Sequence, residues 1–315
     1  MTTVADGLFQ YGGVPVGMGL DWANIYATRR NGRTWFVDAN YGADGNNGKS
    51  WENALLTMDA AFDRVASGDL IYFTGKIQEQ LVTPVQVFDV SVIGMGNRPR
   101  HADSTPSGGQ YATAQWAPPS SGVAAQATVR VLQQGWRFQN ILFTAVDADA
   151  ACVEVVRNAA SGNDERDGSH CVIRGCRGSG AGIGVRLTAT SFTENPFNVL
   201  IEGNKFNSMT YGILASAAQP NSCIIRGNVF QGTTNAITAK LQASLIISNV
   251  IQGFTAAANS GGIDLTGGVA GNVVTLNYLG GTYSNAGGYV AAGAGDEWGG
   301  NMNSLTGGWT AADPA

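Results

Sequence analysis

The stretch Ile201-Glu202-Gly203-Asn204-Lys205-Phe206 decides the fold, because the chain repeats its pattern. In each copy an apolar residue is followed three positions later by asparagine (Cys176 in one copy) and then, two positions on, usually by another apolar residue. The other copies are Val172-Ile173-Arg174-Gly175-Cys176, Ile225-Arg226-Gly227-Asn228-Val229-Phe230, Ile246-Ile247-Ser248-Asn249-Val250-Ile251 and Val274-Thr275-Leu276-Asn277-Tyr278-Leu279, with an earlier one expected at Phe138-Gln139-Asn140-Ile141-Leu142.

The spacing of the copies indicates a solenoid. Asn204, Asn228, Asn249 and Asn277 follow one another at steps of 24, 21 and 28 residues. A repeat of this length, made of short apolar segments and glycine turns, is one coil of a solenoid. Leucine-rich repeats have a similar length, but their repeated leucines and helical returns are missing here. The sequence therefore predicts an all-β fold, a parallel β-helix.

The alternation of side chains along each short strand predicts what every repeated position does. One inward column is expected to hold Ile173, Ile201, Ile225, Ile246 and Val274, and a second to hold Phe206, Phe230, Ile251 and Leu279. We expect Asn204, Asn228 and Asn249 to be structural, because asparagine tolerates the left-handed turns between strands and can bond its copies in neighbouring coils. On the outside, Arg174, Glu202 and Arg226 are expected to form a plus–minus–plus ladder at a spacing of about 4.8 Å.

Composition supports this fold and excludes several functional classes. Charged residues are 13% of the 315 residues, about half the usual share, and glycine contributes 44 residues. This composition disfavours both a helical bundle and simple disorder. A net charge of −5 offers no basic field for nucleic acid, and no apolar run approaches the ~18 residues of a membrane span. The first residues carry no secretory signal pattern, so the four cysteines are expected to be free, buried thiols.

The first third of the chain is irregular. Residues 1–34 are expected to form an arm, which either packs on its own domain or docks on another subunit, and its Arg29, Arg30 and Arg33 are either solvated or face an acidic partner. Strands are expected at Trp35-Phe36-Val37, Asp69–Phe73 and Val90–Asn97, and a helix over Thr57–Ala66 with Thr57 as N-cap. The loop Asp38–Gly48 resembles a calcium loop, but Lys49 stands where the twelfth-position Glu is needed, so turn chemistry is expected.

Two segments carry a family resemblance. The first runs through Trp35-Phe36-Val37-Asp38, Gly42-x-Asp44-Gly45-x-x-Gly48, Trp51-x-Asn53-Ala54, Ala60-Ala61 and Gly68-Asp69-x-Ile71. It resembles the opening segment of pectate-lyase-like right-handed β-helix proteins, whose short helix caps the N-terminal end of the solenoid. The second, Asp296-Glu297-Trp298-x-Gly300-Asn301 with Thr310 and Pro314, is similar to the C-terminal closure of β-helix proteins from tailed bacteriophages.

Residues for catalysis are scarce, and we assign no catalytic, cofactor-binding or metal-ligating residue. Glycoside hydrolysis needs two carboxylates at a fixed separation. Between Cys171 and Val290 the only acids are Glu194, Glu202 and Asp264. The densest charge cluster is Asn163-Asp164-Glu165-Arg166-Asp167, which with His170 is either a site or a solvated insertion between coils. Nothing in the sequence suggests stacking platforms for sugars, because Trp116, Trp136, Tyr211 and Tyr278 are scattered.

These observations predict a non-enzymatic structural protein of a tailed-phage virion. The expected parts are an attachment arm at 1–34, an opening segment with the capping helix at 35–97, a β-helix body at 98–297 and a closing segment at 298–315. The protein would be a spike or capsid decoration, made in the host cytoplasm and docked on a capsid or other virion protein through its arm, and the phage resemblance implies a homotrimer. The alternatives are a tailspike-like receptor-binding protein or depolymerase (lyase or hydrolase) acting on host-surface glycans, and a glycan-binding module without cleavage.

One subunit interface is also expected. Ile247 and Thr275 follow Arg174, Glu202 and Arg226 in the same outward position, so this surface column loses its charges towards the C-terminus. An uncharged strip marks a contact surface more often than bare surface. The coils from Leu245 to Tyr278 are therefore expected either to meet another subunit or to be covered by a loop such as 100–128.

Overall fold

The computed structural model describes residues 32–95, 114–145, 147–159, 165–189, 195–216, 218–252, 261–269, 271–280 and 295–303, together with short strands at 4–5, 8–11, 14–16, 289–290 and 308–310. The fold is the right-handed parallel β-helix expected from the sequence, with one helix among these residues. No helix in the described part of the chain is long and apolar enough to cross a membrane.

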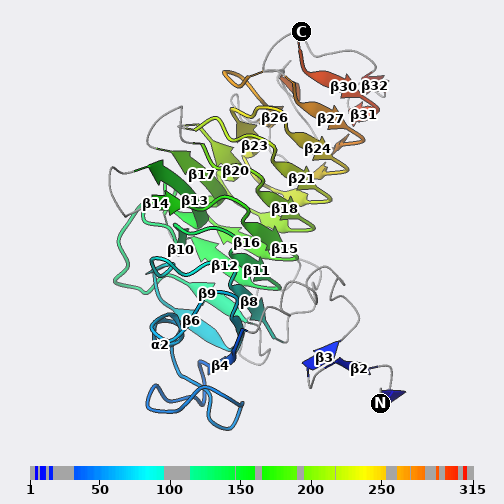
Figure 1. The fold of residues 1–315 in the computed structure, drawn as a ribbon. Helices are drawn as coiled ribbons and strands as arrows, with labels where there is room; N and C mark the ends of the chain where they lie inside the picture. The colour runs from blue at the N-terminus through cyan, green and yellow to red at the C-terminus, as the bar shows by residue number, and fades with distance from the viewer. Residues whose placement is uncertain are drawn as a thin grey trace.

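From β5 (Leu70–Thr74) to β29 (Tyr289–Val290) each coil contributes one strand to each of three sheets, and the coils stack along one axis (Figure 1). The first sheet contains β4 (Thr34–Asp38), β5 (Leu70–Thr74), β8 (Ser91–Gly94), β11 (Arg137–Gln139), β15 (Val172–Arg174), β18 (Leu200–Glu202), β21 (Ile224–Arg226), β24 (Leu245–Ile247), β27 (Val273–Thr275) and β30 (Glu297–Gly299). The second contains β6 (Lys76–Gln78), β9 (Gln115–Ala117), β12 (Leu142–Ala145), β16 (Arg177–Gly180), β19 (Lys205–Asn207), β22 (Val229–Gln231), β25 (Val250–Gln252), β28 (Tyr278–Leu279), β31 (Asn301–Asn303) and the antiparallel β32 (Gly308–Thr310).

From β5 to β29 the strand of the third sheet follows that of the second in each coil. It contains β7 (Leu81–Val82), β10 (Val129–Val131), β13 (Ala151–Ala159), β17 (Ile183–Ala189), β20 (Tyr211–Ala215), β23 (Asn235–Ala239), β26 (Gly261–Asp264) and β29 (Tyr289–Val290), and β14 (Glu165–Asp167) pairs antiparallel with β13. The N-terminal strands β1 (Val4–Ala5), β2 (Leu8–Tyr11) and β3 (Val14–Val16) form an antiparallel sheet of their own.

Both inward columns predicted from the repeats are confirmed. Ile173, Ile201, Ile225, Ile246 and Val274 pair in register along the first sheet and are fully buried. Phe206, Phe230, Ile251 and Leu279 do the same along the second. Glycines of the second and third sheets make room for the rings, since a Cβ on Gly184 would lie 2.3 Å from Phe206 and one on Gly212 would lie 2.4 Å from Phe230.

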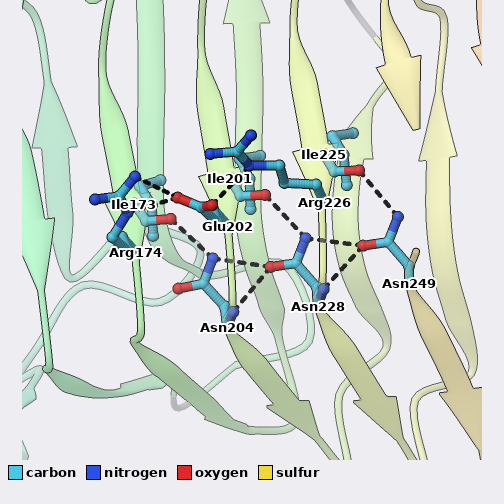
Figure 2. A network of polar contacts seen from close by, with 9 residues as sticks. All are labelled: Ile173, Arg174, Ile201, Glu202, Asn204, Ile225, Arg226, Asn228 and Asn249. Carbon is cyan, nitrogen blue, oxygen red and sulfur yellow. Dashed lines mark hydrogen bonds and ion pairs between the residues drawn. The ribbon is translucent and has the colours of Figure 1, made fainter. Parts of the chain in front are cut away.

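The asparagine ladder is also confirmed, with one correction to its geometry (Figure 2). The backbone N–H and the side-chain amide of Asn204 both donate to Oδ1 of Asn228, at 2.9 and 3.0 Å, and Asn228 repeats this with Asn249. The second amide hydrogen donates across the turn to a strand carbonyl, from Asn204 to Ile173 O and from Asn228 to Ile201 O. The ladder continues through Asn277 to Asn301.

The left-handed residue of each turn is the one before the asparagine, not the asparagine itself. These positions are Asn140, Gly175, Gly203, Gly227, Ser248, Leu276 and Gly300, with φ between 54° and 63°. The earliest repeat is therefore shifted by one residue, because Asn140 takes the left-handed position and Ile141 stands level with Cys176. Cys176 ends the ladder, since its N–H donates to Asn204 Oδ1.

The helix is shorter than expected. It spans Met58–Phe62 (α2), with Thr57 Oγ1 accepting the N–H of Ala60 as predicted. It ends early because the buried carboxylate of Asp69 accepts the N–H of Ala66, together with Trp35 Nε1 and the N–H of Arg33. This network draws the chain out of the helical path. The predicted strands at 35–37, 69–73 and 90–97 correspond to β4, β5 and β8.

The expected part boundaries stay predictions. β30 begins at Glu297, crosses the expected boundary between residues 297 and 298, and pairs with β27, so the parallel sheet continues across this boundary. Residues 17–31 and 96–113 lie outside the described residues, and with them Arg29, Arg30 and part of the 100–128 loop.

Candidate functional site

The predicted outer ladder lies on the first sheet, where β15, β18 and β21 stack (Figure 2). Nε of Arg174 donates to Oε2 of Glu202 at 2.5 Å, and Nε of Arg226 donates to Oε1 at 2.6 Å. Both carboxylate oxygens of Glu202 are therefore held by guanidinium groups. In the next coils Ile247 and Thr275 continue the column, as expected.

A second ladder of the same kind lies on the third sheet and was missed from the sequence. Arg130, Glu154 and Arg186 are register partners in β10, β13 and β17. Oε2 of Glu154 lies 3.0 Å from Arg130 Nε, and Oε1 lies 3.7 Å from a terminal nitrogen of Arg186 and accepts Thr188 Oγ1 at 3.3 Å. Their only shared signal is an apolar–charged–apolar triplet, Val129-Arg130-Val131, Val153-Glu154-Val155 and Val185-Arg186-Leu187, which lacks the glycine and asparagine that mark the other repeats.

The charge cluster near His170 is an insertion between coils, and no acid–base pair forms among its described residues. Asp167 lies in β14, the returning strand of a hairpin, where Oδ2 accepts Gln134 Nε2 at 2.7 Å and lies 3.7 Å from Arg157 Nε. Its Oδ1 accepts the N–H of Ser169. The ring of His170 packs edge-on against Phe197 at 5.0 Å. Asn163 and Asp164 lie outside the described residues.

The other candidate residues are placed apart. Asp264 stands in β26 and accepts the N–H of Thr266 through Oδ1, whereas Glu194 lies outside the described residues. Trp116 and Trp136 are fully buried, each donating Nε1 to a backbone carbonyl, so neither forms a stacking surface for sugars.

The loop that resembles a calcium site uses its acids in turns. Oδ1 of Asp38 accepts the N–H groups of Asn40 and Tyr41, as expected for turn chemistry. The carboxylate of Asp44 accepts the N–H groups of Leu56 and Thr57 and the hydroxyl of Thr57, which tie the loop to the start of α2.

With this geometry established, comparison with known proteins identifies the family. A family model described as periplasmic copper-binding protein (NosD) matches residues 129–304, more than half of the chain. The chain belongs to this family. The match covers the coils from β10 to β31, which include both outer ladders and the asparagine ladder. No curated protein matches the sequence.

The described histidine, cysteine, aspartate and glutamate residues do not fit a copper site of the kind that the family description names. Copper is bound by thiolate, thioether or imidazole groups gathered around one point. In the described ranges no three His, Cys, Asp or Glu side chains are grouped to hold a metal ion. Cys152, Cys171, Cys176 and Cys223 are free and buried, as predicted, and burial raises the pKa of each thiol to about 12, which disfavours the thiolate that binds metal.

Solved structures similar to this chain include two sugar-processing enzymes and a phage tailspike in complex with a pentasaccharide. A GH136 lacto-N-biosidase from Eubacterium ramulus aligns with a TM-score of 0.48 and 9% identity over 82% of this chain, which spans 58% of that protein. Pectate lyase Pel9A aligns with 0.43 and 15% over 86% of this chain and 77% of its own length. A tailspike protein of E. coli bacteriophage HK620, in complex with a pentasaccharide, aligns with 0.36 and 12% over 90% of this chain and 53% of its own. These values are too low to transfer an activity.

Proposed function

We propose that this protein is a non-catalytic β-helix scaffold, a spike or decoration protein of a tailed-phage particle that docks through residues 1–34. The observation that carries the non-catalytic part is the engagement of Glu202. Its two oxygens accept hydrogen bonds from Arg174 and Arg226. The coils directly above and below it therefore present guanidinium groups, whereas polysaccharide hydrolysis needs a second carboxylate within about 5–10 Å.

Two further features support the scaffold. Glu154 lies between two arginines, with its oxygens 3.0 Å from Arg130 and 3.7 Å from Arg186, and Asp167 accepts Gln134 Nε2 and lies 3.7 Å from Arg157 Nε. The N-terminal strands β1, β2 and β3 pair with one another and with none of the described strands of the coils, which suits a separate attachment arm. The resemblance of the residues around Asp296 to phage β-helix closures supports the particle.

The activity half of the proposal is tested with bacterial surface polysaccharide and the purified full-length protein. We expect no release of reducing ends from the wild type or from Glu202→Gln. Release by the wild type that Glu202→Gln abolishes would make Glu202 catalytic, and release that persists in this variant would place a depolymerase elsewhere on the chain. Either result overturns the non-catalytic scaffold and favours the depolymerase alternative.

The location is tested on particles. An antibody against the β-helix should label intact tailed particles from a lysate of the cells that produce the chain, at a fixed position on each particle in electron micrographs. Mass spectrometry of the same particles should find the chain at constant stoichiometry. Its absence from purified particles, with the protein present in the lysate, would contradict a virion component.

A further inference from the structure

The outer face of the first sheet carries a continuous aliphatic column at the first position of successive strands. Register places these residues one above another from β11 to β30. They are Arg137, Val172, Leu200, Ile224, Leu245, Val273 and Glu297. Each aliphatic member precedes an inward residue of the core and so faces outward. Four are half-buried, and Val273 is 41% exposed. At a strand spacing of about 4.8 Å the column is about 29 Å long.

The order of residues in this column is symmetric about its centre. Ile224 stands in the middle, with a leucine on each side of it, then a valine on each side. The ends break the symmetry only in charge, since Arg137 closes one end and Glu297 the other. Read in either direction the apolar part is identical, and reversing the column exchanges a positive end for a negative one.

We propose that this column is the contact surface for a second copy of the chain, related by a two-fold axis at Ile224. A two-fold contact places the same patch of both subunits against itself. Reversing one copy sets Ile224 against Ile224, Leu200 against Leu245 and Val172 against Val273. Arg137 then meets Glu297 of the second copy at both ends.

The charges decide between alignments of the two copies. In a parallel alignment at equal height, Arg137 would meet Arg137 and Glu297 would meet Glu297. Like charges in contact disfavour that arrangement, whereas reversal makes both ends complementary. Arg137 lies 3.6 Å from Asp89 in its own chain, but a guanidinium carries five N–H donors and can serve both carboxylates. The two-fold dimer thus competes directly with the homotrimer implied by the phage resemblance.

The neighbouring column suits the rim of such a contact. Arg174, Glu202 and Arg226 lie two residues further along the same strands and carry their own ion pairs. Interfaces place polar, solvated residues around an apolar centre. The five aliphatic side chains of the column offer a smaller area than the ~800 Å² that each partner of a stable interface buries. The dimer is therefore a weak one that dissociates on dilution.

Sedimentation of the full-length protein tests the contact. We expect the wild type to move from monomer to dimer with rising concentration, and Ile224→Asp to raise the dissociation constant at least tenfold, because two carboxylates would face each other on the axis. Val229→Asp is the matched control, since Val229 lies in the same coil, half-buried and outward on the second sheet. It should dimerise like the wild type, and equal melting temperatures of the two variants establish that both are folded.

Charge exchange tests the reversed alignment itself. Glu297→Arg and Arg137→Glu should each weaken the dimer, and the double variant should restore it towards the wild-type dissociation constant. A wild type that stays monomeric, a trimer, or a dimer insensitive to Ile224→Asp overturns the proposal. A dimer that depends on Ile224 but is not restored by the double exchange overturns the two-fold arrangement.

Discussion

At the scale of single residues, the turn between the first and second sheets imposes a left-handed conformation on the residue before each ladder asparagine. Glycine fills this position at Gly203, Gly227 and Gly300, but Ser248 and Leu276 occupy it with a Cβ. A left-handed L-residue costs about 1–2 kcal/mol. The cost is tolerated because the asparagine that follows is fixed by hydrogen bonds to both neighbouring coils.

Leu276→Gly should therefore stabilise the protein. The leucine has φ of 55° and is 57% exposed, so little apolar burial is lost with its side chain. Relief of the left-handed strain exceeds the extra freedom of glycine in the unfolded chain, and the free energy of unfolding should rise by about 0.5–1 kcal/mol. Urea denaturation measures it. Val273→Gly, in the extended strand of the same coil, should instead lower the free energy of unfolding, and an equal loss in both variants would contradict the strain argument.

At the scale of elements, α2 depends on acids from outside the helix. Oε2 of Glu79, just after β6, accepts the N–H of Asp59 at 3.0 Å. Burial raises the pKa of Glu79 to about 7, and the carboxylate of Asp59 adds to the rise, against hydrogen bonds from the N–H groups of Asp59 and Met58. The carboxyl of an unfolded chain titrates near 4.5, so between about pH 4.5 and 7 the folded protein holds more protons. Its stability therefore falls as pH rises through this window.

Glu79→Gln should remove that fall. Above pH 7 the variant should be more stable than the wild type by about 1 kcal/mol, a value reduced for the partial solvent exposure of the carboxylate. Melting temperatures between pH 4.5 and 8 measure the slope. Glu52→Gln is the control, because the pKa of Glu52 is lowered by hydrogen bonds from its own backbone N–H and from Ser50 and lies outside the window. A wild-type slope that persists in Glu79→Gln would show that another group titrates.

The elements that could be predicted from the sequence are those that stacking makes repetitive. Equivalent inward positions in successive coils have the same environment, so the residue types at Ile201, Asn204 and Phe206 recur in recognisable copies. The outer ladder through Glu202 was predictable because it lies inside that repeated motif. The ladder through Glu154 was missed, since its members share only a short apolar–charged–apolar triplet, without the glycine and asparagine that mark the other repeats. The early end of α2 was missed because it depends on the carboxylate of Asp69. That group accepts the N–H of Ala66, three residues away, and is fixed by Trp35 and Arg33, 34 and 36 residues away, and the apolar pattern shows none of these bonds.

A second inward polar ladder was missed for a related reason. It lies at the start of the first-sheet strands, where Cys223 N–H donates to Ser244 Oγ, Ser244 N–H to Asn272 Oδ1, and Asn272 N–H to Asp296 Oδ1. All four residues are buried. Serine, asparagine and aspartate all supply an acceptor oxygen. The same hydrogen bond therefore recurs from coil to coil with different residue types, and no sequence motif reveals it.

At the scale of the whole molecule, the core changes character along the axis. The N-terminal coils are filled by aromatic rings in mutual contact: Phe62, Phe73, Trp116, Trp136, Phe138 and Phe143. From Cys176 onward the asparagine ladder runs through each turn, and the inward residue of the second sheet changes from the stacked Phe206 and Phe230 to the smaller Ile251 and Leu279. The two halves therefore depend on different interactions, ring packing in one and buried amide hydrogen bonds in the other.

Because each coil of a solenoid contacts only its neighbours, damage to the ladder should stay local. Asn277→Ala leaves the N–H of Asn249 and the carbonyl of Ile246 without their bonds in a buried turn, at a cost of about 1–3 kcal/mol for each group. Hydrogen exchange measured by mass spectrometry should accelerate in β24, β27 and β30 and stay at the wild-type rate in β8 and β11. Asn207→Ala is the control, since that amide bonds Ser208 at the surface, and its exchange should match the wild type throughout. Uniform acceleration in Asn277→Ala would instead show that the aromatic and ladder halves unfold as one cooperative unit, because a local defect would then lower the protection of every coil equally.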